Sequence, residues 1–377
     1  MRIVVTCAGT GGHIVPAIAI ANIIKEKYVD STFLFIGTEK GMENDLVTKA
    51  GYEIKSIRTG KLIRKFTFEN FRQMRNASLG IGDAVKILKE FKPDLVIGTG
   101  GYICTSVMKA AKKLKIKYIL HESNAFPGLS VKLLAKDAYR VLLGFEEAKA
   151  RLNTIENVVV TGNISKITKE EFTRLDREKC KEELGLKNVK SKIVFVTFGS
   201  QGAKYLNEYI IELAKKQNKD FFFILVTGNN NYDEVMDKVS KVEKDLNISL
   251  SSFLKVEKFV YEMDKMYKVS DICITRAGAM TINELETVKV PAVLIPLPTA
   301  AENHQYYNAK VLEGVGAASI IEQKDLNVDR LVSKLLEMSD ERVYKRYKGS
   351  YDKLKENDAK EKILNEIRIF KNAYVKD

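Results

Sequence analysis

Short apolar runs alternate with helical patterns along almost the whole chain. This alternation is typical of parallel βαβ units, and it occurs twice. The strands predicted in the first half are Ile3 to Thr6, Thr32 to Ile36, Glu53 to Ile57, Leu95 to Gly98, Tyr118 to His121, Arg140 to Leu143 and Val158 to Thr161. Those predicted in the second half are Ile193 to Phe198, Phe221 to Thr227, Phe253 to Val256, Ile272 to Thr275, Ala292 to Ile295 and Ala318 to Ile321.

The repeated rhythm predicts two doubly wound α/β domains, each built on a parallel sheet. A chain of 377 residues exceeds the usual size of one hydrophobic core. The alternation breaks near Gly162, where TGNISKITKEEF places turn residues before a strongly charged helix. We therefore expect a domain boundary at this point, with the two domains facing each other.

Composition excludes several classes of protein. The chain is 45% hydrophobic and 29% charged, as in ordinary soluble globular proteins. No apolar run approaches the ~18 residues of a membrane span, and no signal-peptide pattern opens the chain, so we expect a cytoplasmic protein. The four cysteines lack paired spacing and the three histidines lie far apart, so the sequence indicates neither a disulfide framework nor a zinc site.

The charge of the chain favours a negatively charged partner. The net charge is +13 and the pI is near 9.2. From Lys55 to Arg75, seven basic residues stand against one acidic residue, interleaved with apolar and aromatic side chains that fit an anionic membrane surface. The same apolar residues could equally form the core side of a long amphipathic helix through Leu88. Nucleic acid is a less favoured partner, because no binding-module signature is present.

The segment TCAGTGGHIVPAIAIA, Thr6 to Ala21, follows the first predicted strand. Its glycines precede His13 and a helix that has Pro16 near its start. Such a loop directs backbone N–H groups and the positive helix end toward one place, which suits a diphosphate. A turn that needs glycine for its own conformation explains the loop equally well. Neither a dinucleotide-binding fingerprint nor a P-loop matches the spacing.

Three further glycine-rich loops follow predicted strands. They are GTGGY at Gly98 to Tyr102, FGSQGA at Phe198 to Ala203 and TRAGAMT at Thr275 to Thr281. Ligands of doubly wound sheets bind outside the carboxyl ends of the strands. Two anion-binding loops in each half therefore predict a binding cleft.

The segment Ile274 to Pro298 predicts a nucleoside diphosphate site that needs no metal. Gly278 lets the backbone approach a ligand, and a helix opens around Met280 and Thr281. Glu284 lies about one turn further, where its carboxylate can accept hydrogen bonds from two ribose hydroxyls. The structural alternative is an exposed helical glutamate after a turn glycine.

Polar residues gather after the next strand, in TAAENHQYYNAK. Glu302, Asn303, His304 and Gln305 offer donors and acceptors that suit sugar hydroxyls. Glu302 could instead be a first-turn charge that interacts with the helix dipole.

The ordered set TCAGTGGHIVPAIAIA, GTGGY, HESNAFPG, TGN, FGSQGA, TRAGAMTINE and ENHQYYNA resembles the MurG family over almost the whole chain. These are the UDP-N-acetylglucosamine:N-acetylmuramyl-(pentapeptide)-pyrophosphoryl-undecaprenol N-acetylglucosamine transferases of bacterial cell-wall synthesis. The resemblance implies a GT-B fold, with two Rossmann-like domains and a cleft between them. Residues 1–162 would bind the lipid-linked acceptor and be joined by the C-terminal helix 351–377, and residues 163–350 would bind UDP-GlcNAc.

The resemblance implies an inverting transfer without a metal cofactor. The C4 hydroxyl of the muramyl sugar would attack the anomeric carbon of GlcNAc and expel UDP. His13 is the candidate general base, since the reference pKa of histidine is near 6.5. A role of His13 in orientation or helix capping stays open, as does a carboxylate elsewhere as the base.

The resemblance also assigns binding residues. In the donor site, the backbone of Val260 would meet the uracil, and Asn124 would reach over from the first domain. The donor residues are Thr10, Gly11, Gly12, Asn124, Lys166, Ser200, Gln201, Gly202, Val260, Ala279, Met280, Thr281, Glu284, His304 and Gln305. The acceptor residues are Gly11, Gly12, Gly100, Gly101 and Tyr102. The residues expected to contact the membrane, peripherally and at its cytoplasmic face, are Lys61, Leu62, Ile63, Arg64, Lys65, Phe66, Phe68 and Phe71.

Several positions depart from the family pattern. Where many members read GNPVR, this chain has Gly162-Asn163-Ile164-Ser165-Lys166, and a lysine lacks the bidentate fork of arginine. Ser123 stands at a common glutamine position, and Phe198 at a common glycine position. The alternatives on the same architecture are a UDP-GlcNAc 2-epimerase, a glycolipid synthase and a nucleotide-sugar-binding protein without catalysis.

Overall fold

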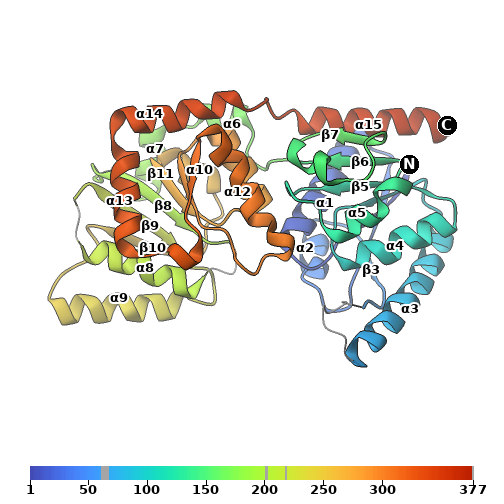
Figure 1. Cartoon of the computed structure of the whole chain (residues 1–377), viewed down its shortest axis with the longest axis horizontal. Helices are drawn as coiled ribbons and strands as arrows, with labels where there is room; N and C mark the ends of the chain where they lie inside the picture. Colours follow the sequence, from blue (N-terminus) through green and yellow to red (C-terminus); the bar gives the residue numbers. More distant parts are fainter. Residues whose placement is uncertain (61–67, 200–202, 217–218, 376–377) are drawn as a thin grey trace. The chain divides into compact units, whose positions relative to one another are not determined.

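The computed structural model describes residues 1–60, 68–199, 203–216 and 219–375, with the side chains of residues 68–74 excepted. The chain forms two compact units. The first comprises Met1–Ile164 and Glu356–Asp377, and the second comprises Ser165–Lys355 (Figure 1). The predicted boundary after residue 162 lies two residues before the end of the first segment.

A sheet of parallel strands forms the centre of the first unit, in the order β3-β2-β1-β4-β5-β6-β7. Each strand is one that the apolar runs predict. The strands are β1 (Arg2–Thr6), β2 (Thr32–Gly37), β3 (Ile54–Ser56), β4 (Leu95–Gly98), β5 (Lys117–Glu122), β6 (Arg140–Leu143) and β7 (Val158–Val160). In the central pairings, Val4 of β1 lies beside Leu34 on one side and Val96 on the other.

Helices cover both faces of this sheet because successive strand residues point to opposite faces. Val4 packs with residues of α3, α4 and α5, whereas Ile3 and Val5 pack with residues of α1 and α15. The helices are α1 (Gly11–Lys27), α2 (Glu43–Lys49), α3 (Phe68–Phe91), α4 (Tyr102–Lys113), α5 (Leu129–Leu134) and α15 (Ala359–Tyr374), with 3₁₀ turns η1 (Ala135–Asp137) and η2 (Glu146–Arg151).

The second unit repeats the arrangement with strand order β10-β9-β8-β11-β12-β13, all parallel. The six apolar runs predicted for the second half are these strands. Their bounds are β8 (Lys192–Thr197), β9 (Phe221–Val226), β10 (Leu254–Glu257), β11 (Ile272–Thr275), β12 (Ala292–Leu294) and β13 (Ala318–Ile320).

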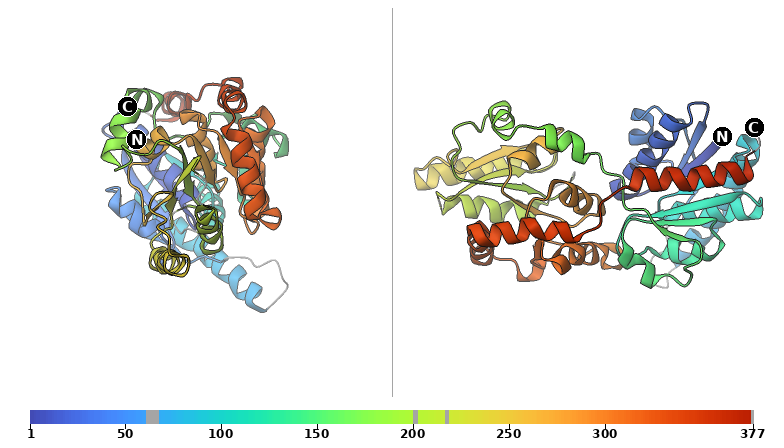
Figure 2. Two further views of the ribbon diagram at one scale, coloured as in Figure 1. Left: turned by 90° about the vertical axis from the view of Figure 1, so that its left-hand side faces the viewer. Right: turned by 90° about the horizontal axis from the view of Figure 1, so that it is seen from above.

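The helices of the second unit again lie on both sides of its sheet (Figure 2). Val194 and Val196 of β8 pack with residues of α8, α9 and α13, and Phe195 packs against Tyr267 of α10. The helices are α6 (Lys169–Arg174), α7 (Arg177–Glu183), α8 (Lys204–Lys215), α9 (Tyr232–Leu246), α10 (Met263–Val269), α11 (Ala279–Val288), α12 (His304–Val315), α13 (Val328–Ser339) and α14 (Glu341–Ser350), with 3₁₀ turns η3 (Ala301–Asn303), η4 (Gln323–Asp325) and η5 (Tyr351–Lys353).

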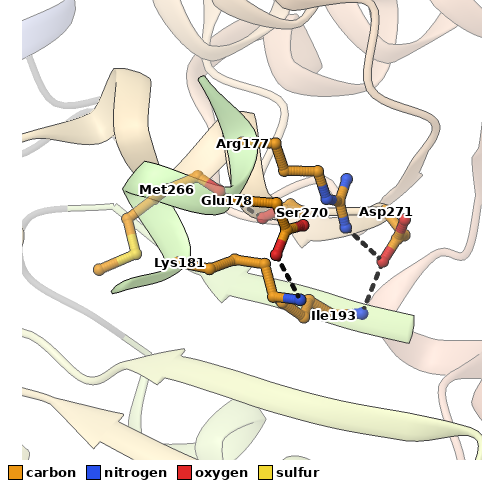
Figure 3. A network of polar contacts seen from close by, with 7 residues as sticks. All are labelled: Arg177, Glu178, Lys181, Ile193, Met266, Ser270 and Asp271. Carbon is orange, nitrogen blue, oxygen red and sulfur yellow. Dashed lines mark hydrogen bonds and ion pairs between the residues drawn. The ribbon is translucent and has the colours of Figure 1, made fainter. Parts of the chain in front are cut away.

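A polar network holds the first helices of the second unit to the amino ends of its strands (Figure 3). Asp271, just before β11, accepts hydrogen bonds from Ile193 N at 2.8 Å and from Arg177 Nη2 at 3.0 Å. Ser270 Oγ donates to Met266 O at 2.5 Å and caps the end of α10. This charged cluster lies at the amino ends of the strands, whereas the glycine-rich loops follow their carboxyl ends. We therefore assign the cluster a structural role.

The C-terminal helix α15 belongs to the first unit and packs along α1. Ile363, Ile367 and Phe370 are fully buried, and Arg140 Nε donates to Glu366 Oε2 at 2.9 Å. The helix begins at Ala359 and not at the predicted residue 351. Tyr351 instead stays with the second unit, since its hydroxyl donates to Val290 O at 2.7 Å.

The segment proposed for membrane contact is only partly covered. Lys61, Leu62, Ile63, Arg64, Lys65 and Phe66 lie outside the described residues, and Phe68 and Phe71 lie in α3, where their side chains are not described. The alternative interpretation, a long helix through Leu88, agrees with α3, which buries Ala84 and Leu88. Within the described part of the chain, none of the helices combines the length and apolar character needed to cross a bilayer.

The buried face of α15 generates a stability prediction. Ile367→Ala should lower the free energy of unfolding of the first unit by about 2–5 kcal/mol, because it removes a fully buried side chain. Ile369→Ala on the same helix is the matched control, since Ile369 is 39% exposed and should cost less than about 1 kcal/mol. Urea denaturation followed by circular dichroism measures both, and equal effects would contradict the docking of α15.

Candidate functional site

The first glycine-rich loop joins β1 to α1. Gly9 has φ +99°, a left-handed conformation that glycine adopts at little cost. Thr10 is extended, and its carbonyl accepts hydrogen bonds from His13 N at 3.0 Å and Ile14 N at 3.2 Å, which starts the helix. The first N–H groups of an α-helix have no partner within the helix, so this end of α1 is a candidate anion site.

His13 is held in the first turn of α1 by the loop that follows β4. Its Nδ1 lies 3.1 Å from Thr99 O, and Thr99 Oγ1 donates to His13 O at 2.7 Å. Because a carbonyl oxygen only accepts, Nδ1 carries the proton and Nε2 is the basic nitrogen. Burial lowers the pKa of His13 from its ordinary value near 6.5, while the bond to Thr99 opposes this shift. His13 is therefore neutral at pH 7, the form that a general base requires.

Gly100 and Gly101 are required by the packing of this site. Their φ values are +111° and +84°. A Cβ at Gly100 would lie 2.6 Å from His13 Nδ1, and one at Gly101 would lie 2.5 Å from Ala8 O. The two glycines therefore let the loop after β4 pack against the first loop, with Tyr102 opening α4 beside them. Their predicted contact with the acceptor diphosphate stays a prediction.

Gly11, Gly12 and Gly278 differ from this pair, because no contact with the described residues requires glycine there. A Cβ at Gly11 would meet nothing within 4 Å, and one at Gly12 would lie 3.6 Å from Thr10 Oγ1. At Gly278 the nearest atom would be Thr281 Oγ1, at 3.7 Å. Among the described residues, the space beside Gly11 is thus open, and a Cβ at Gly12 or Gly278 would make only an ordinary van der Waals contact.

The loop after β5 is organised by Glu122, a residue that the sequence reasoning did not select. This buried carboxylate accepts hydrogen bonds from Asn124 N at 2.9 Å, Asn124 Nδ2 at 3.0 Å and Gly128 N at 2.8 Å. The side chain of Asn124 is thus held in place from within its own loop. The sequence held a signal for this role, because Glu122 stands at the end of a strand and two residues before Asn124, a spacing at which a side chain can bond the backbone of its own loop.

In the second unit, Gly278 precedes the first turn of α11, formed by Ala279, Met280 and Thr281. Arg276, next to this turn, is buried and donates to Ile295 O at 3.0 Å, Pro296 O at 3.1 Å and Gln323 Oε1 at 2.8 Å. Burial lowers the pKa of Arg276 to about 10, so the guanidinium is still charged at pH 7. Arg276 therefore connects the loop after β11 with the loop after β12 and with η4.

Glu284 is held by Tyr267, another residue that sequence reasoning did not select. The buried Tyr267 hydroxyl donates to Glu284 Oε2 at 2.9 Å, and its ring packs at 90° against Phe195 with centroids 5.6 Å apart. Burial raises the pKa of Glu284 from its ordinary value near 4.5, and the Tyr267 bond and the charge of Lys166 lower it. Glu284 is thus half-buried and oriented, unlike the exposed residue of the structural alternative. A lone buried tyrosine carries no pattern that would have identified it.

The polar cluster after β12 has an unusual backbone. Glu302 and Asn303 are consecutive residues with φ of 52° and 53°, in a region that side chains rarely occupy. Gln305 Oε1 accepts from Leu297 N at 2.9 Å, and His304 Nδ1 lies 2.7 Å from Ala301 O. These bonds orient the amide of Gln305 and leave His304 Nε2 as the acceptor.

Several predicted donor residues are separate from these clusters or outside the described residues. Ser200, Gln201 and Gly202 lie outside the described part of the chain. Val260 lies between β10 and α10, and exposed Lys166 is close enough to influence the carboxylate of Glu284. Among the described residues, no group of three or more His, Cys, Asp or Glu side chains is arranged to hold a metal ion. The expected independence from metal stays a prediction.

Comparison with known proteins identifies the family. Residues 3–143 match the glycosyltransferase family 28 N-terminal domain, and residues 193–363 match the C-terminal domain of that family. A relative from Caldanaerobacter subterraneus, named UDP-N-acetylglucosamine--N-acetylmuramyl-(pentapeptide) pyrophosphoryl-undecaprenol N-acetylglucosamine transferase, is 42% identical over 89% of this chain and 90% of its own. A Thermoanaerobacter relative of the same name is 38% identical over 98% and 99%. The chain belongs to the MurG family.

A solved structure supports the fold that MurG membership implies. The crystal structure of Acinetobacter baumannii MurG superposes with a TM-score of 0.76 at 25% identity, covering 98% of this chain and 99% of that one. The predicted GT-B fold, with two Rossmann-like parallel-sheet domains, is confirmed.

Two departures from the MurG pattern have local structural explanations. Phe198 is buried in the core of the second unit, where it packs with Leu206 and other apolar residues. Ser123 is buried, and its Oγ lies 3.4 Å from His121 Nδ1. Both residues therefore support the loops in which they lie.

The two kinds of glycine predict different effects of substitution by alanine on protein stability. Gly101→Ala should lower the free energy of unfolding of the first unit by about 1–3 kcal/mol, because alanine is strained at this positive φ and its Cβ would collide with Ala8 O. Gly12→Ala is the matched control and should leave stability unchanged or raise it by up to about 1 kcal/mol, since it lies in a helix with free space. Thermal denaturation of both variants tests this, and a stable Gly101→Ala protein would refute the packing role.

Proposed function

We propose that this chain is an inverting glycosyltransferase. It moves GlcNAc from UDP-GlcNAc to the C4 hydroxyl of undecaprenyl-pyrophosphoryl-MurNAc-pentapeptide, which converts lipid I to lipid II. The observation that carries this proposal is the match, over nearly the full length of both chains, to relatives that bear the name of this transferase. The orientation of His13 and Glu284 supports it.

In this proposal, the first unit binds the acceptor. The open backbone at Gly11 and Gly12, at the start of α1, receives the pyrophosphate of the lipid. His13 Nε2 accepts the proton of the attacking hydroxyl, since Thr99 holds the proton of the ring on Nδ1. Because burial lowers the pKa of His13, Nε2 stays unprotonated near neutral pH and can accept this proton.

The second unit binds the donor. The first N–H groups of α11 hold the UDP diphosphate, Glu284 accepts hydrogen bonds from the ribose hydroxyls, and His304 and Gln305 contact the sugar. The negative charge that develops on UDP is stabilised by the positive end of α11 and by the charge of Arg276 nearby, without a metal ion.

The same proposal places the protein on the cytoplasmic face of the cell membrane as a peripheral protein. The basic and aromatic segment from Lys61 to Phe71 and the net charge of +13 favour an anionic surface. A substrate anchored by an undecaprenyl chain would be presented at that surface.

Direct transfer is the experiment that tests this function. Purified protein is incubated with radiolabelled UDP-GlcNAc and a short-chain muramyl pyrophosphoryl lipid, with and without EDTA. We expect a labelled lipid product in both samples. Formation of UDP-ManNAc from UDP-GlcNAc alone would indicate the epimerase, and transfer to diacylglycerol in place of the muramyl lipid would indicate the glycolipid synthase. Binding of the donor without any product would favour the non-catalytic alternative.

The role of His13 predicts a loss of turnover. His13→Ala should lower kcat by roughly 10²–10⁴-fold and leave the affinity for UDP-GlcNAc nearly unchanged. In the wild type, kcat/KM should fall with acid only below pH 6.5, because protonation removes the base and burial lowers its pKa. Steady-state kinetics and calorimetry measure these effects, and unchanged turnover would remove His13 from the mechanism.

The bond that orients Glu284 predicts a selective effect on the donor. Tyr267→Phe should raise the KM for UDP-GlcNAc by about 3- to 10-fold, the effect of roughly 1 kcal/mol, with the acceptor KM unchanged. Tyr351→Phe is the matched control, because it removes a buried hydroxyl of the same unit that, among the described residues, bonds Val290 O and not Glu284. Glu284→Ala should raise the donor KM further, and an unaltered KM would refute the ribose contact.

A further inference from the structure

Two large aromatic side chains are exposed on the loop between β10 and α10. Tyr261 is 90% exposed and Phe259 is 40% exposed. Their ring centroids lie 4.8 Å apart with an interplanar angle of 61°, an edge-to-face pair. Val260 lies between them in the chain. Tyr261 therefore presents almost its whole ring to solvent while one edge rests on Phe259.

This loop is connected to the carboxylate that we assign to the ribose. Helix α10 begins at Met263, directly after the loop, and its Tyr267 donates to Glu284 Oε2. At a rise of about 1.5 Å per residue, the start of α10 lies roughly 6 Å along the helix from Tyr267. The base of a ribonucleoside is bonded to C1′, the neighbour of the carbon that carries the 2′ hydroxyl. A base whose ribose meets Glu284 thus lies within reach of this loop.

Contacts at both ends hold the loop in place. At the start, Thr227 N donates to Glu257 O, the last residue of β10, at 3.0 Å. At the other end, Lys265 Nζ lies 2.7 Å from Glu262 and 2.8 Å from Glu183 of α7. The exposed ring of Tyr261 is therefore carried by an anchored loop.

We propose that Tyr261 stacks on the base of the donor nucleotide and so supplies affinity for it. This inference rests on the proposed function. The rings of Phe259 and Tyr261 are in contact, so the two side chains lie on the same side of the loop. A base that meets the backbone of Val260 by its edge can then offer one face to the Tyr261 ring. Base–aromatic stacking does not depend on the hydroxyl of tyrosine.

The absence of tryptophan from the sequence makes a direct test possible. Tyr261→Trp introduces a single indole whose fluorescence reports the surroundings of this position. Titration with UDP should quench this fluorescence in a saturable way. Leu246→Trp is the matched control, because Leu246 is 50% exposed at the end of α9. This end of α9 precedes β10 and so lies at the amino ends of the strands, away from the Tyr261 loop, and the indole there should not respond.

A series of variants separates stacking from other roles. Calorimetry with UDP should give a Kd for Tyr261→Phe within about twofold of the wild type, and a Kd for Tyr261→Ala weakened roughly tenfold. A role of the hydroxyl would weaken Tyr261→Phe as well, and a structural role would lower the Tm of Tyr261→Ala. Either of these results would overturn the proposal.

The outcomes also distinguish this inference from the proposed function. If Tyr261→Ala binds UDP as tightly as the wild type, or if Tyr261→Trp binds UDP by calorimetry without a change in fluorescence, stacking is refuted and the transferase proposal is unaffected. If the wild type does not bind UDP at all, the proposed function itself fails.

Discussion

The parallel direction of all strands within each sheet is the constraint on which the rest of the structure depends. When every strand runs the same way, each loop that follows a strand leaves the same edge of the sheet and leads into the start of a helix. The amino ends of α1 and α4 therefore lie at one edge of the first sheet, and those of α11 and α12 at one edge of the second. Backbone N–H groups and positive helix ends are concentrated there without any clustering of charged side chains.

The two side chains at the centre of the proposed mechanism, His13 and Glu284, are each oriented by a polar group of a different element. Thr99 O determines which nitrogen of His13 carries the proton, and the Tyr267 hydroxyl fixes one oxygen of Glu284. Arg276 joins two neighbouring loops through carbonyl oxygens. In such pairs the supporting group is fully or largely buried, so the bond is little weakened by water. This arrangement keeps the residues that would meet ligands in place before any ligand binds.

The glycine-rich motifs contain two physically different kinds of glycine. Gly100 and Gly101 have positive φ angles and stand against His13 and Ala8, so the fold itself requires them. Gly11, Gly12 and Gly278 have space beside them, so the fold does not explain their small size. A motif that looks uniform in sequence thus combines residues that shape the loop with residues that leave room for a ligand.

Much of the fold could be predicted from the sequence, because it follows from local pattern. The thirteen predicted apolar runs correspond to the thirteen strands of the described residues, since buried parallel strands must be apolar on both faces. The sequence likewise predicted glycine loops after strands and Glu284 on the helix that follows one of them, and His13 and Glu284 lie in α1 and α11. The start of α15 was predicted eight residues too early, because the contact of Tyr351 with Val290 O joins positions far apart in the chain.

The orientation of the site residues could not be predicted in this way. The tautomer of His13 depends on Thr99, the setting of Glu284 on Tyr267 and that of Asn124 on Glu122. The first two are pairings between residues distant in sequence, and no periodicity encodes them. The sequence by itself determined which elements form and which residues stand at their ends. Only the tertiary structure decided which buried partner each of those residues meets, because hydrogen bonds depend on distance and direction in space.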